Sequence, residues 1–287
     1  MQDALSHLHP SDIAESIIAM EKKFLSLYNI QSCFVGFEYE FYCISKPNNQ
    51  FFHEISLING VQSLKKEIGN WQFEIVTKPH NSFIQAVHEM YIIKNLLVKI
   101  AKKHNIIISQ NAVTFKDNNP PSSMQISISM LSGGQFLNSS HQNFMKAVHT
   151  LVHNLYNSTI LTCPTPNCYK RFSNVEIAKQ FKNSPTHINW GVENRTLAIR
   201  LASINEAPSG QRIEYRTPSP QANPYYVAIA ILSSLLCISG IEYPQVFVDS
   251  FESTSQKLPQ TINEAYNAFV KSSMFNIINT FSYKHAI

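Results

Sequence analysis

The segment Gln211-Arg-Ile-Glu-Tyr-Arg-Thr-Pro218 places three charged residues at alternate positions among strand-forming neighbours. Side chains of a β-strand alternate between its two faces, so Arg212, Glu214 and Arg216 are predicted to share one face. The isoleucine and tyrosine between them fall on the opposite face, where they would pack into an apolar core. The segment is therefore predicted to be a half-buried strand that presents a carboxylate between two guanidiniums to a cleft. Such a cleft suits anions and metal ions.

A second segment, Val35-Gly-Phe-Glu-Tyr-Glu-Phe-Tyr42, shows the same alternation with acidic residues. Glu38 and Glu40 fall on one face, and aromatic side chains fall on the other. Two neighbouring carboxylates raise each other's pKa unless a cation neutralises them, and a divalent metal would do so. An acidic, solvent-exposed edge strand would give the same pattern, and this segment alone leaves that alternative open.

The composition excludes several classes of protein. The chain has 287 residues, of which 44% are hydrophobic and 15% charged, with a formal net charge of +4. Its basic residues form no run longer than a pair such as Lys65-Lys66, so nucleic acid is not an expected partner. The apolar stretch from Tyr225 to Ile241 contains serines, has Asn223 and Pro224 at its start and Gly240 at its end, and is predicted to be a buried core helix rather than a membrane span.

Cysteine usage and the N-terminus predict a cytoplasmic protein. The five cysteines are odd in number and contain no Cys-x-x-Cys pair, which favours a reducing compartment. The first ten residues show no basic start followed by an apolar stretch, so no cleavable signal is expected.

Hydrophobic periodicity predicts one compact α+β domain over residues 1–287, with several strands turning polar faces toward a shared cavity. The expected helices begin near Ile13, run from Ser82 to about His104, and run from about Gln142 to Tyr156. The expected further strands are Trp71–Thr77, Met124–Met130 and Leu197–Leu201, and a loop is expected at Cys163–Asn167. Arg195 and Arg200 lie five residues apart, so both can serve one face only if a bulge intervenes or the strand starts after Arg195.

Five of these segments, in this order, resemble the signature blocks of the glutamine synthetase family's catalytic domain. They are Gly36–Phe41, Trp71–Ile75, Asn167–Arg171, Asn194–Arg200 and Arg212–Tyr225, within a similarity that extends from Ile13 to about Phe269. The resemblance implies a curved, mostly antiparallel sheet that forms a metal-lined funnel and is packed with helices. It also implies an ATP-dependent ligase of nitrogen metabolism, which activates the glutamate side-chain carboxylate as an acyl phosphate and condenses it with ammonia.

The resemblance implies a role for each matching residue. Glu40, Glu67 and Glu74 would bind one Mg²⁺ or Mn²⁺ ion, Glu38 and Glu214 would bind another, and Gln125 stands where the family has a metal-binding histidine. Arg195 and Arg200 would contact the phosphoryl group that leaves ATP, and Arg212 and Ser129 would contact the nucleotide. Arg171 and Arg216 would hold glutamate, and Glu176 would close over the acyl intermediate and help deprotonate ammonium.

Several departures from the family pattern affect these expectations. Gln125 and Ser127 replace two histidines, which shifts the expected metal preference toward Mg²⁺. The loop Asp117–Ser123 lacks the family's glycines, and spacing near Glu67 and Glu176 is one residue shorter. The family's small N-terminal β domain has no counterpart, and the C-terminus is shorter. We therefore expect either that the usual ring of subunits does not form or that the site is exposed to water. A homo-oligomer of another kind is still compatible with the sequence.

Two alternatives to the glutamate–ammonia ligase remain at this point. One is a γ-glutamyl-amine ligase that uses another amine or another acid, which the altered loop favours. The other is a catalytically impaired member that binds nucleotide or glutamate in a regulatory role. The retained carboxylates and arginines argue against the second, because unneutralised acids in one cleft destabilise a protein.

Overall fold

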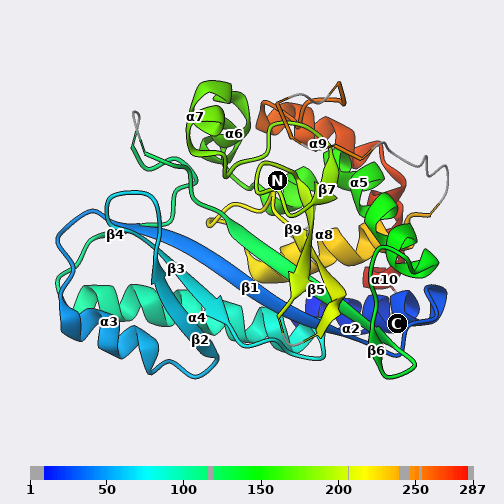
Figure 1. The fold of residues 1–287 in the computed structure, drawn as a ribbon, viewed down its shortest axis with the longest axis horizontal. Helices are drawn as coiled ribbons and strands as arrows, with labels where there is room; N and C mark the ends of the chain where they lie inside the picture. The colour runs from blue at the N-terminus through cyan, green and yellow to red at the C-terminus, as the bar shows by residue number, and fades with distance from the viewer. Residues whose placement is uncertain are drawn as a thin grey trace.

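The computed structural model describes residues 10–115, 119–205, 207–238, 246–247, 249–251 and 254–283. The described strands form a nine-stranded sheet in the order β2-β3-β1-β5-β9-β8-β7, with β4 beside β1 and β6 beside β5 (Figure 1). Each pairing among them is antiparallel except that of β7 with β8. The strands are β1 (Ser32–Cys43), β2 (Val61–Lys66), β3 (Gln72–Thr77), β4 (Ile108–Ser109), β5 (Met124–Ser132), β6 (Gln135–Phe136), β7 (Trp190–Val192), β8 (Ile199–Ile204) and β9 (Ala207–Tyr215).

The described helices pack mainly around α8, which contacts α2, α4, α5 and α10, while α9 packs against α5. In Figure 1, α8 lies behind β5 and β9. The predicted α+β class and mostly antiparallel sheet are confirmed. The helices are α2 (Pro10–Leu27), α3 (Asn49–Ser56), α4 (Phe83–Lys103), α5 (Gln142–Thr162), α6 (Pro166–Ser173), α7 (Val175–Phe181), α8 (Pro224–Leu236), α9 (Ile262–Val270) and α10 (Ser273–Tyr283).

The two-residue alternation predicted for the central strands is confirmed by which of their side chains join the hydrophobic core. On β1, Phe37, Tyr39 and Phe41 are fully buried in the hydrophobic core. Ile213 and Tyr215 of β9 belong to the same core. The Tyr215 hydroxyl is satisfied there by the Ser158 hydroxyl of α5 at 2.7 Å, so the aromatic ring is buried without leaving its polar atom unpaired. The opposite faces of these strands are thereby left to polar residues.

Helix α8 begins as the sequence predicts. The Asn223 side chain accepts a hydrogen bond from the Tyr225 backbone N–H at 3.0 Å, and Pro224 occupies the first turn, where its missing N–H has no partner to lose. The helix ends at Leu236, and the expected stop at Gly240 lies outside the described residues. No helix in the described part of the chain has the length and apolarity needed to cross a membrane.

Several boundaries differ from the sequence predictions by a few residues, and the largest difference is at the end of α5. Helix α5 continues to Thr162 rather than ending at Tyr156, because the hydroxyls of Ser158, Thr159 and Thr162 donate to carbonyls in the preceding turn and remain satisfied while buried. The predicted loop Cys163–Asn167 is shorter, since α6 already begins at Pro166. Strand β8 starts after Arg195, which is one of the two alternatives that the five-residue spacing allowed.

The core-facing side of β9 should be more sensitive to truncation of a side chain than the exposed side of α2. Ile213→Ala should lower the free energy of unfolding by about 2–5 kcal/mol, because Ile213 is fully buried and the loss leaves a cavity. Ile18→Ala is the matched control, since Ile18 is 52% exposed on α2 and should change stability by no more than about 0.5 kcal/mol. Urea unfolding measures both, and equal effects would contradict the assigned faces of the strand.

Candidate active site

The carboxylates of β1 and β3 gather on the face of the sheet opposite the core. Glu40 is the register partner of Glu74 across β1 and β3, and Glu38 is the partner of Gln125 across β1 and β5. Glu67, which directly follows β2, interacts electrostatically with Glu40. The outward positions of three neighbouring strands thus bring the acidic residues predicted from the sequence into one cluster.

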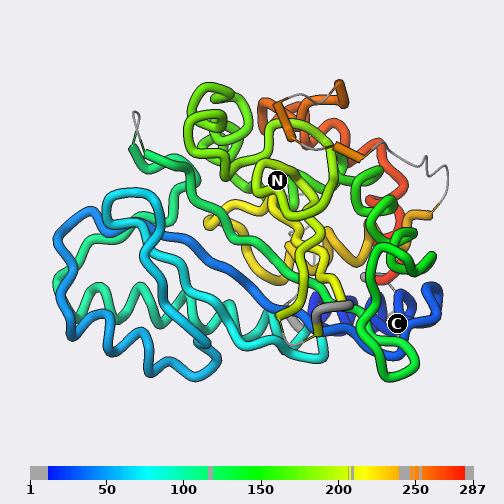
Figure 2. Tube along the Cα trace, in the orientation of Figure 1, coloured from blue at the N-terminus to red at the C-terminus, as the bar shows by residue number. Residues whose placement is uncertain are grey.

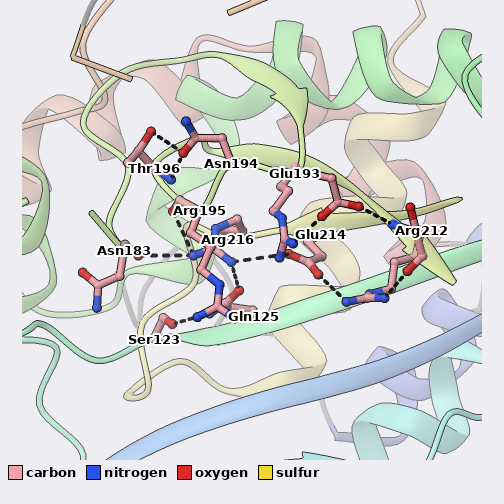
Figure 3. A network of polar contacts seen from close by, with 12 residues as sticks. Ser123, Gln125, Asn183, Glu193, Asn194, Arg195, Thr196, Arg212, Glu214 and Arg216 are labelled. Atoms are coloured by element: carbon pink, nitrogen blue, oxygen red, sulfur yellow. Dashed lines mark hydrogen bonds and ion pairs between the residues drawn. The ribbon is translucent and has the colours of Figure 1, made fainter. Parts of the chain in front are cut away.

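Guanidiniums surround Glu214 on the neighbouring part of the same face (Figure 3). Arg200 of β8 donates to Glu214 Oε2 at 2.9 Å, and Arg212 of β9 donates to Oε1 at 2.8 Å. Arg216 Nη1 lies 3.4 Å from Oε2. The Glu214 side chain is 1% exposed, so these are buried, charge-assisted contacts with both carboxylate oxygens engaged. Three cations around one anion leave this part of the face positively charged.

The acidic part of the face has more carboxylates than neighbouring cations. Burial, with the nearby Glu67 charge, raises the pKa of Glu40 to about 7, although the Ser123 N–H donates to its Oε2 at 2.7 Å. Burial also raises the pKa of Glu74, and the adjacent Glu38 and Glu40 carboxylates raise it further. Burial followed by the Glu214 charge raises the pKa of Glu38. These carboxylates lack the cations that their ionised forms need.

A cavity of about 220 Å³ lies between the acidic and basic parts. Its lining includes Glu38, Glu40, Lys65, Glu67, Ile68, Glu74, Gln125, Asn183, Arg195, Arg200, Arg212 and Arg216. A second cavity, of about 260 Å³, shares Glu38 and Arg212 with the first and is also lined by Ser129 and Ser127. The predicted nucleotide contacts Arg212 and Ser129 therefore lie in one cavity that adjoins the carboxylate cluster.

The donor set fits a hard divalent cation. Glu38, Glu40, Glu67 and Glu74 offer carboxylate oxygens, which Mg²⁺ prefers. The raised pKa values of Glu38, Glu40 and Glu74 reflect a site without enough positive charge. In the present arrangement, no three His, Cys, Asp or Glu side chains of the described residues are grouped closely enough to hold an ion.

Two of the predicted metal ligands, Gln125 and Glu214, are bound by guanidiniums. Both oxygens of Glu214 accept from guanidiniums, and the Gln125 side-chain oxygen accepts from Arg216. Gln125 or Glu214 would therefore reach an ion only after a guanidinium moves aside. Their assignment to a metal stays a prediction.

Arg171 is a buried clamp on the segment that follows β9. Its guanidinium donates to the Ser184 hydroxyl at 3.0 Å and to the carbonyls of Arg216, Thr217 and Pro218 at 2.6, 3.1 and 3.2 Å. The side chain is 3% exposed. It therefore positions Arg216 through the backbone, and its expected contact with glutamate stays a prediction.

Arg216 is anchored as firmly as Arg171. Its Nη2 donates to the carbonyls of Asn183 and Arg195 at 3.2 and 2.9 Å (Figure 3). Those contacts tie β9 to the loop that carries Arg195, whose exposed side chain lines the cavity.

Glu176 is the predicted residue that the structure does not bring to the cluster. It lies in the first turn of α7 with 87% of its side chain exposed, and its nearest ion-pair partner is Lys179 at 3.7 Å. It is absent from the lining of the 220 Å³ cavity. A closing role for Glu176 would require α7 to move, and it stays a prediction.

Three residues of the site were missed in the sequence. Lys65 lies 3.9 Å from Glu74, its register partner across β2 and β3. Glu193 accepts from Arg200 at 2.6 Å and from the Ser203 N–H at 2.7 Å. Asn183 lines the cavity from a loop. Alternation along β2 could have indicated Lys65, and Glu193 directly precedes the Asn194-Arg195 motif, but no sequence pattern marks Asn183.

Comparison with known proteins identifies the family of this chain. Residues 56–282 match the family model described as glutamine synthetase, catalytic domain. The chain belongs to the glutamine synthetase family. A glutamine synthetase of Pyrococcus abyssi is 28% identical over 240 residues, covering 73% of this chain and 52% of that protein. Gamma-glutamylputrescine synthetase of Escherichia coli is 26% identical, covering 70% of this chain and 43% of its own length.

The chain is also similar to a glutamate–isopropylamine ligase of a Pseudomonas species, at 26% identity over 76% of the chain and 48% of that protein. The chain spans about half the length of the curated relatives it matches, or less. The solved structure of ligand-free GmaS superposes with a TM-score of 0.74 at 19% identity, covering 94% of this chain and 72% of that one. That likeness supports the fold alone.

The raised pKa of Glu40 predicts how stability depends on pH. From pH 4.5, the usual value for a glutamate, to about 7, the native ligand-free protein keeps a proton that the unfolded chain has released, so the free energy of unfolding falls as pH rises. The fall attributable to Glu40 is on the order of 3 kcal/mol. Glu40→Gln should remove that part of the fall.

Urea unfolding at about pH 5 and about pH 7.5 measures this difference. Glu176→Gln is the control, because Glu176 is exposed and should leave the pH dependence unchanged. A Glu40→Gln protein whose stability falls as steeply as that of the parent would show that Glu40 is not the proton site.

Proposed function

We propose that this protein is an ATP-dependent carboxylate–amine ligase, which activates the side-chain carboxylate of glutamate as an acyl phosphate and condenses it with ammonia. The observation that carries the proposal is the adjacency of a four-carboxylate cluster to four arginines around one cavity. Membership of the glutamine synthetase family supports the reaction class.

The chemistry of amide formation explains why both charges are needed. A carboxylate is a poor electrophile, and phosphorylation converts it into one with a good leaving group. Negative charge spreads over the transferring phosphoryl oxygens, and the guanidiniums that line the cavity would stabilise it. Arg195 and Arg200 are proposed for this role, with Arg212 and Ser129 holding the nucleotide in the adjoining cavity.

A divalent cation, Mg²⁺ or alternatively Mn²⁺, is proposed at the carboxylate cluster. Glu38, Glu40, Glu67 and Glu74 would hold it, and it would supply positive charge that orients and neutralises phosphate oxygens. The same residues determine what happens without the ion. Without it, the carboxyl groups of Glu40 and Glu74 retain protons near neutral pH, because burial disfavours uncompensated charges.

A second candidate is a ligase that uses an amine larger than ammonia. The altered loop is rigid where it is described, because the carbonyl of Pro120 accepts from the Tyr42 hydroxyl at 2.8 Å and the Ser122 N–H donates to the Ala112 carbonyl at 2.8 Å. Its residues 117 and 118 lie outside the described part. A cavity of about 450 Å³ lies beside the loop, with Phe115, Pro121 and Ile177 in its lining. Two of the relatives are named for the larger amines putrescine and isopropylamine.

One assay tests the proposed reaction. Purified protein with Mg²⁺, ATP, glutamate and hydroxylamine should release phosphate and form γ-glutamyl hydroxamate in equal amounts. Replacing hydroxylamine by ammonia, methylamine, isopropylamine or putrescine then ranks the amines and separates the two candidates. Nucleotide binding without phosphate release for any acid or amine would contradict both and favour a regulatory family member.

Arg195→Ala should lower turnover by about 10³-fold or more, the scale of a lost arginine that stabilises a phosphoryl group. Lys99→Ala is the matched control, since Lys99 is an exposed cation on α4 and should leave the rate unchanged. Steady-state phosphate release measures both variants. A near-normal rate for Arg195→Ala would remove Arg195 from the proposed chemistry.

A further inference from the structure

Cys163 and Cys168 form a pair of thiols beside the Arg171 clamp. Cys163 caps the C-terminus of α5, and Cys168 lies in the first turn of α6. Both are free and buried, and each lies close enough to influence the pKa of the other. The turn between the two helices therefore brings the two thiols near each other, although five positions separate them in sequence.

Cys168 has the surroundings of a reactive thiol. Its sulfur lies 3.3 Å from the Thr165 hydroxyl and 3.6 Å from the Gln221 side-chain oxygen. The first turn of a helix carries a partial positive charge, which favours a thiolate. The hydrogen bond from Cys163, with further ones from Ser219 and Thr165, lowers the pKa of Cys168 to about 6 against the opposing effect of burial.

Cys163 lies in surroundings that favour the protonated thiol, in contrast to Cys168. It is fully buried, and burial together with the neighbouring Cys168 raises the pKa of its thiol well above the usual value. One thiol of the pair is thus suited to attack an oxidant, and the other keeps its proton until a partner sulfur becomes electrophilic.

Cys168 lies one side chain below the surface. Thr165 and Gln221, both in contact with its sulfur, are half-exposed. Its neighbours Asn167 and Lys170 on α6 line the 450 Å³ cavity. Figure 2 shows α6 and α7 standing at the edge of the molecule, near the loop that follows β4. Cys168 itself is 1% exposed, so a small oxidant would reach its sulfur past the half-exposed side chains of Thr165 and Gln221.

We propose that Cys163 and Cys168 are a reversible redox-modification site, at which a peroxide closes a disulfide between α5 and α6. The Cys168 thiolate attacks one peroxide oxygen, the O–O bond breaks, and hydroxide leaves while Cys168 becomes a sulfenic acid. The Cys163 sulfur then attacks the Cys168 sulfur, so that the S–S bond forms and the S–O bond breaks. The departing hydroxyl takes the Cys163 proton as water, and the two thiols have reduced one peroxide.

The site adjoins the candidate active site. The Cys163 thiol lies 3.5 Å from the Thr217 carbonyl, which also accepts from Arg171 at 3.1 Å. Arg171 follows Cys168 by one turn of α6. Closing the disulfide removes the thiol hydrogen at that carbonyl and restrains the turn that carries Arg171. The redox chemistry itself does not depend on the proposed ligase function.

Mass spectrometry of the full chain tests the proposal directly. The folded protein is treated with hydrogen peroxide, unfolded, alkylated with N-ethylmaleimide and digested with trypsin. Residues 147–170 form one tryptic peptide that contains both cysteines. It should lose two hydrogens and take up no maleimide, and dithiothreitol before alkylation should restore two alkylated cysteines. Cys33, Cys43 and Cys237 serve as internal controls and should remain alkylated.

Two variants test the order of the reaction. Cys163→Ser should stop at a Cys168 sulfenic acid, which dimedone captures, whereas Cys168→Ser should leave Cys163 unoxidised at the same peroxide dose. The proposal is overturned if both thiols of the parent peptide remain alkylated, if the other three cysteines oxidise as fast, or if dimedone labels Cys163 rather than Cys168. The parent measurement decides the matter even where a variant folds poorly.

Discussion

Glu214 and the guanidiniums of Arg200, Arg212 and Arg216 are the interaction on which this face of the sheet depends. A carboxylate that is 1% exposed is strongly unfavourable without ionic partners, and these three supply them from two neighbouring strands. Arg216 also binds the Gln125 side-chain oxygen and two loop carbonyls, so the ion pairs fix β5, β8, β9 and the Arg195 loop relative to one another. Arg171 extends the same scaffold by holding the carbonyls that follow β9.

The acidic part of the face has no comparable compensation. The cation nearest to Glu74 is Lys65, at 3.9 Å with an exposed side chain, and such a pair contributes little. The cavity is therefore polarised, with guanidiniums on one side and carboxylates that retain protons on the other. A substrate complex that carries both polyphosphate and a divalent cation complements such a cavity. Binding of such a complex would explain why the arginines and the carboxylates lie side by side in one cavity, although each group is unfavourable without a ligand.

Much of this arrangement follows from two-residue alternation in the sequence. Alternation predicted which face of the sheet each charged side chain occupies, because aromatic or aliphatic residues stand at the intervening positions of both segments. These side chains are Glu38, Glu40, Arg212, Glu214 and Arg216. The placement of Arg171 was not predictable, since its partners are backbone carbonyls more than forty residues further along the chain. Glu176 failed to join the cluster because its position depends on how the short helix α7 packs, which no periodicity encodes. Helix α5 is longer than predicted because hydroxyl groups that usually mark helix ends are satisfied inside it.

Proton release on Mg²⁺ binding is the measurement that bears on the acidic part of the cavity, because an ion that binds beside the protonated Glu40 and Glu74 must displace their protons. Isothermal titration calorimetry near pH 7 in buffers of different ionisation enthalpy counts those protons. We expect Mg²⁺ binding to release protons near pH 7, and we expect the release to vanish above about pH 9, where Glu40 and Glu74 are already ionised. Mg²⁺ binding without proton release near pH 7, or no binding at all, would contradict this expectation.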